Sequence, residues 1–558
     1  MTHLIAIVVA VLAIAFPAAT AEPADGIFQL AQYMPADADV FVAFRADDAY
    51  LDTLDSVLAG ANTLAADLGS PGVNLNARAM IANALQVERS NLDAFLAWAG
   101  DAIGIAAVAE GDGTPIWLAA IPHANRQAAD VFLRTQGFVD GGTYGTYSAY
   151  GRDGISQVVL LEDTVAFVIP GPEFAPDVAS GEYGRLSNDP GYVAAVRALP
   201  VESYNAAAYL SRTFAAAQLG LSMDTQNGVI VGLTLADAGG IALIADVVQM
   251  PGSTPVTQPL SINPEFRRFV PADATAVVHG AELGGLINTA IDALEANGIP
   301  NMRANTQALL RGAGIDLTAM LNWMKGDFAL FARIDLQGLY RYAVGTTSDP
   351  ETLQDLFDIG LVVEAVNPAG AAETARGLAS VLRALGATER ADVTTETVGG
   401  VELTVLRIDT LEAFAVRVPL AIAVGANDEV FVLGTYNAVT SILSGEPGID
   451  SAASYGDSTA LWLDQPTSVW FVDSDVLAGA VGALVALGPA VEPAYLDIIA
   501  VLDENAPPPE PILPAPAAID GIISNLGEFA RYATITTNVD DDGVQRLRAA
   551  ITLGASSR

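Results

Sequence analysis

Apolar positions near the start of the chain change their spacing from that of a strand to that of a helix. Residues 39–44 are rich in Val and Phe and follow Pro35, which is typical of a β-strand set off by a turn. Asp47 and Asp48 come next and suit the first turn of a helix, where negative charge is stabilised. The apolar positions that follow have helical spacing, at Leu51, Leu54, Val57 and Leu58. The pattern predicts a strand followed by a helix.

The same strand and helix pattern returns later in the chain, built from different residues. The letters PADADVFVAFRA at 35–46 match PADATAVVHGAE at 271–282, so a second strand is expected at 276–279. The apolar positions of the second helix are Leu283, Leu286, Ile287, Ala290, Ile291 and Leu294. Two later landmarks recur in the same order, namely LDAFLAWAGD at 92–101 with LTAMLNWMKGD at 317–327, and Ser-Gly-Glu at 180–182 with the same triplet at 444–446. Repetition on this scale predicts a duplicated domain.

Further elements are expected in pairs, one in each copy. A strand at 116–121 and a helix at 124–135 match a strand at 361–366 and a helix at 369–385. In the first copy, strands are expected at 144–150, 156–168 and 204–210, and in the second copy a Gly399-Gly400 turn, strands through Val432 and a strand at 468–472 take their places. Each copy ends in a hairpin, with strands at 229–235 and 241–248 in the first and at 532–538 and 544–553 in the second.

These elements predict an α+β protein made of two tandem homologous modules. Each module is expected to contain a largely antiparallel sheet with packed helices and a closing β-hairpin. Module one spans 28–249, a linker rich in Pro, Ser and Thr spans 250–261, and module two spans 262–555. Module two contains a Pro-rich loop at 504–518, which is expected to be stiff and extended.

The first 21 residues have the pattern of a secretory signal peptide. Leu4 to Phe16 is an uninterrupted apolar run, Pro17 ends it, and Ala19-Thr20-Ala21 forms an A-x-A cleavage site. The run is shorter than the roughly 20 residues that a membrane span needs. The chain is therefore expected to be exported and to be secreted, periplasmic or cell-surface, with an N-terminal anchor as the alternative if the signal is not cleaved.

Composition excludes several classes of chemistry and partner. The chain has 558 residues, no Cys and a formal charge of −40, from 65 acidic and 25 basic residues. Absence of Cys excludes disulfides, thiol catalysis and thiolate metal sites. The negative charge disfavours nucleic acid and anionic lipid as partners. No integral membrane span is expected after cleavage, which leaves a protein or envelope partner.

The landmarks resemble a bacterial exported family annotated only as a domain of unknown function. That family has an "LPADT"-like opening strand and a "WLGD"-like element. Here the matching residues are Met34-Pro35-Ala36-Asp37 with Trp98-Ala99-Gly100-Asp101 in the first copy, and Val270-Pro271-Ala272-Asp273 with Trp323-Met324-Lys325-Gly326-Asp327 in the second. The resemblance implies an exported envelope protein and carries over no active site.

Candidate acid–base and metal residues each have a structural interpretation. His123, at a strand-to-helix corner, and His279, in a strand, each lack a His counterpart in the other copy. Two histidines without Cys do not make a zinc site, so both are expected to be structural. The run 538–543, NVDDDG, resembles a calcium loop, but position 12 is Ala549 rather than Glu, which favours a hairpin turn.

Adjacent carboxylates, an apolar run and a group of tyrosines each have a functional and a structural interpretation. Asp47-Asp48 and Glu162-Asp163 have the residue type that glycoside hydrolysis uses, although such pairs are expected by chance among 65 acidic residues. Gly479 and Gly482 lie in the apolar run 476–487, expected to be a buried helix rather than a membrane dip. Tyr144, Tyr147 and Tyr150 suit a strand pair better than a binding rim.

The sequence therefore assigns no catalytic, cofactor-binding or metal-binding residue. It favours an exported, non-catalytic protein that binds, scaffolds or associates with the cell envelope. Two alternatives stay open, a secreted carboxylate-based hydrolase and an extracytoplasmic carrier of an apolar ligand. A hydrolase predicts a cleft with converging carboxylates of raised pKa, a carrier predicts a large apolar cavity, and a scaffold predicts a broad exposed face.

Overall fold

A computed structural model of the chain describes most of the two halves of the sequence. The described residues are 26–67, 76–79, 91–109, 115–181, 184–201, 204–219, 228–237, 241–250, 260–296, 298–335, 357–387, 391–413, 416–474, 476 and 530–553. The expected signal peptide, the Pro-rich loop and almost all of the linker and of the apolar run 476–487 lie outside them. The chain divides into two compact units, unit 1 at 1–258 with 539–558 and unit 2 at 259–538.

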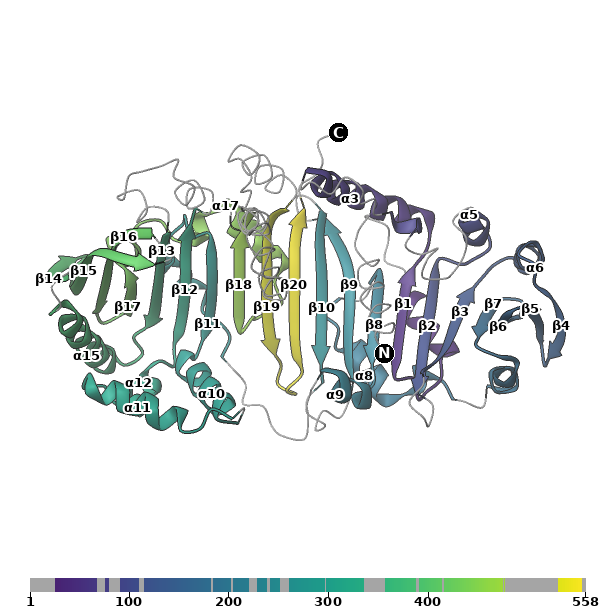
Figure 1. The fold of residues 1–558 in the computed structure, drawn as a ribbon, viewed down its shortest axis with the longest axis horizontal. Helices are drawn as coiled ribbons and strands as arrows, with labels where there is room; N and C mark the ends of the chain where they lie inside the picture. The colour runs from purple at the N-terminus through teal and green to yellow at the C-terminus, as the bar shows by residue number, and fades with distance from the viewer. Residues whose placement is uncertain are drawn as a thin grey trace, which may run out of the picture. The chain divides into compact units, whose positions relative to one another are not determined.

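Unit 1 contains an antiparallel sheet whose strands are far from chain order (Figure 1). Its strands are β1 Val40–Arg45, β2 Ala102–Ala109, β3 Pro115–Pro122, β4 Val139–Tyr144, β5 Tyr147–Arg152, β6 Ile155–Leu161, β7 Val165–Ile169, β8 Ala206–Leu210, β9 Val229–Asp237, β10 Ile241–Gln249 and β20 Gln545–Leu553. In order along the sheet, the neighbours are β4, β5, β6, β7, β3, β2, β1, β8, β9, β10 and β20, every pair antiparallel.

Helices accompany both faces of this sheet. They are α2 Gly26–Gln29, η1 Leu30–Tyr33, α3 Asp48–Asp67, α5 Leu92–Leu96, α6 Arg126–Thr135, η3 Pro172–Phe174, α7 Ala175–Ser180, η4 Leu186–Asn188, α8 Pro190–Arg197 and α9 Arg212–Leu219. On β1, Val40 and Val42 join the hydrophobic cluster that contains α3, whereas Phe41 joins the cluster that contains η1 and α8. Because a strand turns alternate residues to opposite faces, β1 is buried on both. Its uninterrupted apolar sequence follows from that burial.

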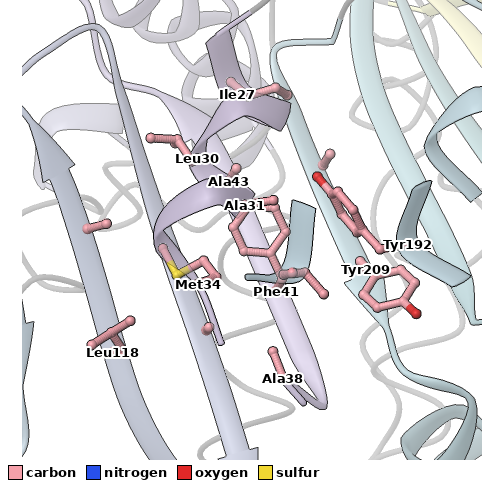
Figure 2. Packing of buried hydrophobic residues seen from close by; sticks show 14 of the residues in the cluster. Ile27, Leu30, Ala31, Met34, Ala38, Phe41, Ala43, Leu118, Tyr192 and Tyr209 are labelled. Atoms are coloured by element: carbon pink, nitrogen blue, oxygen red, sulfur yellow. The ribbon is translucent and has the colours of Figure 1, made fainter. Parts of the chain in front are cut away.

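Figure 2 shows the second of these clusters at close range. Phe41 lies near Tyr192, with their ring centroids 5.8 Å apart, and Tyr192 in turn lies 5.2 Å from Tyr209. Both contacts are edge-to-face, the arrangement that the quadrupoles of aromatic rings favour. Leu30 and Met34 complete the cluster from η1 and the residue after it.

Unit 2 contains a second antiparallel sheet (Figure 1). Its strands are β11 Ala276–Ala281, β12 Asp327–Ile334, β13 Phe357–Glu364, β14 Ala391–Val398, β15 Val401–Ala413, β16 Val416–Ala426, β17 Val430–Thr435, β18 Ser468–Asp473 and β19 Ala530–Val539. The neighbours are β14, β15, β16, β17, β13, β12, β11, β18 and β19. This order matches the first nine places of the unit 1 order, with β14 in the place of β4 and β19 in the place of β9.

The helices of unit 2 cover parts of its sheet. They are η5 Pro264–Phe269, α10 Leu283–Ala296, α11 Met302–Gly312, α12 Leu317–Trp323, α15 Pro368–Gly386, α16 Tyr436–Ser444, η6 Ile449–Ser451, α17 Ala453–Ser458 and η7 Thr459–Leu461. Trp323, at the end of α12, packs on Phe431 of β17 with ring centroids 5.5 Å apart and donates a hydrogen bond to Thr374 of α15. The Trp of the repeated landmark thus anchors helices to the sheet. The protein is α+β with a largely antiparallel sheet, and among its described residues no helix is long and apolar enough to span a membrane.

Two predicted strands of the first copy are each divided into two. The strand expected at 144–150 is β4 and β5, separated by a turn at Gly145, whose φ of +58° suits glycine. The strand expected at 156–168 is β6 and β7, closed by a hydrogen bond from the Glu162 amide to the Val165 carbonyl. Both turns lack the Asn-Gly or Asp-Gly pair that marks a hairpin in sequence, so continuous strands were the wrong prediction.

The last strand of the chain, β20, is held in unit 1 by a buried ion pair. Arg548 of β20 donates two hydrogen bonds to Asp246 of β10, at 2.7 and 2.9 Å. The Tyr204 hydroxyl donates a third to the same carboxylate, at 2.8 Å. Asp246 is fully buried and Arg548 is 8% exposed. Such a pair is weak as a source of stability but costly to break, so it fixes the register of β20 on β10.

Candidate binding face

A row of apolar side chains crosses five adjacent strands on one face of the unit 2 sheet. The pairing registers join Ile535 of β19 to Trp470 of β18, Trp470 to Val278 of β11, Val278 to Leu330 of β12, and Leu330 to Leu361 of β13. Residues directly opposite in an antiparallel pair project to the same face, so these five side chains form one row. Ile359 and Phe357, which precede Leu361 on β13 by two and four residues, project to the same face.

Much of this row is open to solvent. Trp470 is 51% exposed, Leu330 is 40% exposed and Ile535 is 39% exposed. On β13, Phe357 is 42% exposed and Ile359 is 39% exposed. We name the exposed part of this face the apolar strip, which consists of Leu330, Phe357, Ile359, Trp470 and Ile535. Val278 and Leu361 of the same row are less exposed, because they pack against the cluster around Trp323. Several exposed apolar side chains on one face of a protein mark a surface that something covers.

The other face of the same strands is buried, which makes the strip unusual. Val469 and Phe471 flank Trp470 and are 0% and 1% exposed, and Ala329 and Phe331 flank Leu330 and are equally buried. An antiparallel sheet with one buried face ordinarily carries polar side chains on the other. Here both faces carry large apolar side chains. The centre of β18, in the sequence SVWFVD, therefore has the pattern of a strand that is buried on both faces.

The equivalent row in unit 1 is covered by a helix. There Val231 of β9 pairs with Ala208 of β8, Ala208 with Val42 of β1, and Val42 with Ile105 of β2. Val42 and Ala208 are each 4% exposed, and all four residues belong to or pack against the cluster that contains α3. From α3 that cluster takes Leu51, Leu54 and Leu58, which are 0%, 0% and 7% exposed.

In unit 2 the helix in the corresponding chain position does not bury its leucines in this way. Leu283 and Ile287 of α10 pack against the cluster around Trp323, while Leu286 and Leu294 of the same helix are 54% and 37% exposed. That cluster includes residues of β12, β13, β15, β16 and β17, and Val278 and Leu361 of the row pack against it. The strip consists of the row and β13 residues that the described helices leave exposed. The sheet position that holds Ala208 in unit 1 holds Trp470 in unit 2, which adds apolar surface where the described helices give no cover.

His279 forms a polar contact on the buried face of the unit 2 sheet through its Nε2, while its buried Nδ1 has no hydrogen-bond partner. Its Nε2 lies 2.9 Å from Oδ2 of Asp327, and both residues are at most 5% exposed. Asp327 also accepts a hydrogen bond from the Asn263 amide at 2.6 Å, and its own amide donates to Glu364 at 3.1 Å. Asn263 and Glu364 line a cavity of about 260 Å³, but His279 and Asp327 do not. The pair connects η5 with β11 and β12, in line with a structural role.

His123 is buried in unit 1 beside the Trp of the other landmark. Its Nε2 lies 3.1 Å from the Glu162 carbonyl oxygen, and its ring contacts Trp98 edge-on at 5.9 Å. Burial lowers the pKa of His123 below its usual 6.5. The imidazole is therefore neutral at physiological pH. It packs in the core of unit 1 and makes one hydrogen-bond contact through Nε2.

The other acidic candidates serve turns, helix ends and ion pairs. Asp540 accepts hydrogen bonds from the Asp542 and Val544 amides at 3.1 and 2.9 Å, as expected of a turn. Asp47 accepts from the Tyr50 amide at 3.0 Å at the start of α3. Glu162 accepts from the Thr146 hydroxyl and Asp163 pairs with Arg126, while Asp48 pairs with Arg78. No group of three or more metal-ligating side chains occurs within the described ranges.

The three tyrosines of the predicted strand do not form a rim together. Tyr150 is 4% exposed and donates a hydrogen bond from its hydroxyl to Asp130 at 2.5 Å. Tyr147 packs edge-on against Phe167 with centroids 5.8 Å apart, and Tyr144 packs at the edge of the same cluster. Gly479 and Gly482 lie outside the described residues.

A second cavity, of about 480 Å³, is polar and contains a neutralised arginine. Arg333 lies 3.1 Å from Asp273 and 3.3 Å from Asp358, and it donates a hydrogen bond to Ser441 at 3.1 Å. Elsewhere, the Tyr150 hydroxyl lowers the pKa of Asp130, and Arg407 lowers the pKa of Glu396 to about 2. These shifts stabilise the charged carboxylates, which is opposite to the shift a general acid needs.

The apolar strip was not predicted from the sequence, although a signal for it exists. The run at 469–472 reads VWFV, with apolar residues at both sets of alternate positions. That pattern predicts burial on both faces of the strand. What the sequence alone does not reveal is that the described helices leave one of those faces open.

The sequence matches a protein family that has no assigned activity. A family model described as "Protein of unknown function (DUF3352)" matches residues 177–469, just over half of the 558 residues. No curated protein matches the chain. The solved structure "Structure of crystal form I of TP0453" is 10% identical, with a TM-score of 0.22, and the match covers 42% of this chain and 82% of that one. A TM-score this low does not establish a shared fold.

Proposed function

We propose, from the premise that this chain belongs to the DUF3352 family of proteins of unknown function, that it is an exported, non-catalytic binding or scaffolding protein of the cell envelope. The observation that carries the proposal is the apolar strip of unit 2. Five large apolar side chains, each between 39% and 51% exposed, lie on one sheet face. At about 25 cal/mol for each Å² of apolar area removed from water, covering such a face is a strong driving force for association.

The alternatives have less support from the described residues. A hydrolase needs carboxylates that converge on a cleft with raised pKa, whereas Asp130 and Glu396 shift downward and each already pairs with an arginine. A carrier of an apolar ligand needs an apolar cavity, whereas the two cavities described above are lined largely by charged and polar side chains. The exposed apolar side chains of the strip favour a binding surface over either alternative.

The shared strand order of the two units supports the proposal that one scaffold is used twice with different surfaces. Nine strands of each unit follow the same neighbour order, from β4 to β9 in unit 1 and from β14 to β19 in unit 2. Among the described residues, the equivalent rows differ in cover, since the row of unit 1 is buried in the cluster with α3 and the row of unit 2 is partly exposed. We infer that module one is the structural copy and module two the binding copy. Export follows from the leader pattern at 1–21.

A photo-crosslinking experiment in the native envelope tests this proposal. A photoreactive amino acid replaces Trp470 in the full chain, and a matched control replaces Val131, which is 56% exposed on α6 of unit 1. We expect a discrete crosslinked species from position 470 and none of that size from position 131. Equal or absent crosslinking at the two positions would refute the binding function.

A further inference from the structure

We propose that the polar cavity of unit 2 binds a neutral saccharide through the hydroxyl groups of one sugar ring. The cavity has a volume of about 480 Å³, and its lining is charged or polar throughout, formed by Asp273, Arg333, Asp358, Asn437, Thr440 and Ser441. A volume of that size is usual for a small-molecule site. The site is separate from the apolar strip, because Asp358 alternates along β13 with Phe357 and Ile359 and projects to the opposite face.

Arg333 connects the charged groups of this cavity and keeps one donor unused. Its Nη1 lies 3.1 Å from Oδ2 of Asp273, and its Nη2 lies 3.3 Å from Oδ2 of Asp358. The same Nη2 donates a hydrogen bond to the Ser441 hydroxyl at 3.1 Å. The Nε of Arg333 is buried and has no hydrogen-bond partner. A buried donor without an acceptor is costly, so a ligand oxygen that accepts from Nε would be stabilised here.

The remaining lining groups are held in place and can both donate and accept. Asp358 is 5% exposed and accepts a hydrogen bond from the Thr435 hydroxyl at 2.6 Å. Asn437, Thr440 and Ser441 have i, i+3 and i+4 spacing on α16, so they share one face of that helix. Among the described residues, the Asn437 side chain has no hydrogen-bond partner. The cavity therefore combines carboxylates, which accept, with amide and hydroxyl groups, which do both.

Unit 1 shows that the fold does not require these charged groups. Arg333 of β12 lies directly opposite Asp358 of β13. When β1 is aligned with β11 through the repeated Pro-Ala-Asp letters, the strand registers give Val108 of β2 and Ile116 of β3 as the equivalent pair. The same position in the sheet thus accepts two apolar residues. Because a buried ion pair is a weak source of stability, its presence in unit 2 favours a role in binding.

The charges of the cavity select a neutral ligand with many hydroxyl groups. Two aspartates against one arginine, in a chain with a formal charge of −40, disfavour an anion. An apolar ligand finds no apolar side chain in the lining, and the described residues contain no group of three or more metal-ligating side chains. Sugar hydroxyls donate to carboxylates and accept from guanidinium and amide groups. Since such bonds replace bonds to water, we expect a Kd of about 1 mM.

Ligand-observed NMR on the purified full chain tests the inference. The probes are glucose, galactose, mannose and N-acetylglucosamine, each in a saturation-transfer titration. Cyclohexanol is the control for a six-membered ring with a single hydroxyl group, and glucuronate is the control for an anionic sugar. We expect at least one neutral sugar to bind with a Kd between about 0.1 and 10 mM. Cyclohexanol should give no transfer, and glucuronate should bind at least five-fold more weakly than that sugar.

Two variants locate the site. Asn437→Ala removes a side chain that has no partner in the described fold, and it should weaken sugar binding at least five-fold. Asn322→Ala, at an exposed position of α12, is the matched control and should leave binding unchanged. The double variant Arg333→Val with Asp358→Ile installs the residue types of unit 1 and should abolish binding. It should keep the wild-type melting temperature within a few degrees, since the Thr435 hydroxyl still donates to a backbone carbonyl at 3.3 Å.

Four outcomes would overturn the inference. They are the absence of transfer from all four neutral sugars, equal transfer from cyclohexanol, tighter binding of glucuronate than of any neutral sugar, and unchanged binding in Asn437→Ala. If the double variant does not fold, the comparison of Asn437→Ala with Asn322→Ala decides. The photo-crosslinking experiment at Trp470 is independent, so a failure of the sugar site leaves the binding function of the apolar strip standing.

Discussion

Breaking the buried ion pair between Arg548 and Asp246 should destabilise unit 1 more than any change to a surface pair. In Arg548→Met the side chain keeps its length but loses the guanidinium, and the fully buried Asp246 keeps only the Tyr204 hydroxyl of its three side-chain donors. A buried charge left without its partner costs about 3–5 kcal/mol.

The loss of unfolding free energy should be much larger when a buried ion pair is broken than when an exposed one is. Arg134→Met removes the i,i+4 pair with Asp130 on α6, where the Arg134 side chain is 53% exposed, and should lower stability far less than Arg548→Met does. The double variant Asp246→Leu with Arg548→Met removes both charges together. It should recover all but about 1–3 kcal/mol, the cost of leaving the buried Tyr204 hydroxyl without an acceptor.

Urea unfolding provides the measurement, with amide hydrogen exchange to identify the affected strands. A protein with two units need not unfold in one step, so protection of β10 and β20 amides should be followed beside the circular dichroism. With a slope of about 3 kcal/mol per molar urea, a loss of 3–5 kcal/mol moves the midpoint by about 1–1.7 M. The reasoning is refuted if Arg548→Met shifts the midpoint no further than Arg134→Met.

Three further predictions concern single groups. Burial lowers the pKa of His123 in the folded protein. Below about pH 6.5 the imidazole is therefore protonated in the unfolded chain but stays neutral in the folded one, so the free energy of unfolding falls as the pH drops through that value. In urea titrations from pH 7.5 to 5, His123→Leu should flatten this fall, and an unchanged slope would contradict it. The Arg407 guanidinium and the Tyr436 hydroxyl lower the pKa of Glu396 from 4.5 to about 2, so its contribution is present above pH 4.5 and is lost toward pH 2. Glu396→Gln should therefore lose less stability than wild type across that window of an acid titration, and parallel curves would speak against the pairing. At Gly434 on β17 an added Cβ would lie 2.3 Å from the Ile359 carbonyl oxygen, so Gly434→Ala should cost about 1–3 kcal/mol in a melting experiment. Gly456→Ala on α17, where the Cβ meets open space, should be neutral or stabilising, and equal losses in both variants would refute the steric explanation.

Elements with a strong local signal were predictable from the sequence. The opening strand expected at 39–44 is β1 at Val40–Arg45, and the helix expected at 369–385 is α15 at Pro368–Gly386. Asn367 before Pro368 gives α15 a clear start, since its side chain accepts a hydrogen bond from the Gly370 amide at 3.3 Å. In such segments the side chains that define the element lie within a few residues of each other.

Features that depend on distant residues were not predictable in the same way. The position of Trp470 on an open face depends on where α10 and α12 end their cover, and those helices precede it by well over a hundred residues. His279 is polar in an apolar strand because Asp327, 48 residues later, accepts its hydrogen bond. A single sequence gives the type of each residue but not the partner that the fold brings to it.

The place of β20 has a consequence for the order in which the protein acquires its structure. Asp246 and Arg548 are 302 residues apart in sequence, yet their pairing joins β10 to its outer neighbour. A contact of such separation is expected to form late, because the entropy cost of closing a very long loop must be met before the ion pair contributes any stability. We therefore expect β10 to remain an unpaired edge until β20 has been synthesised and has reached it. A chain interrupted anywhere before Gln545 would present that edge to other strands and would be prone to aggregate.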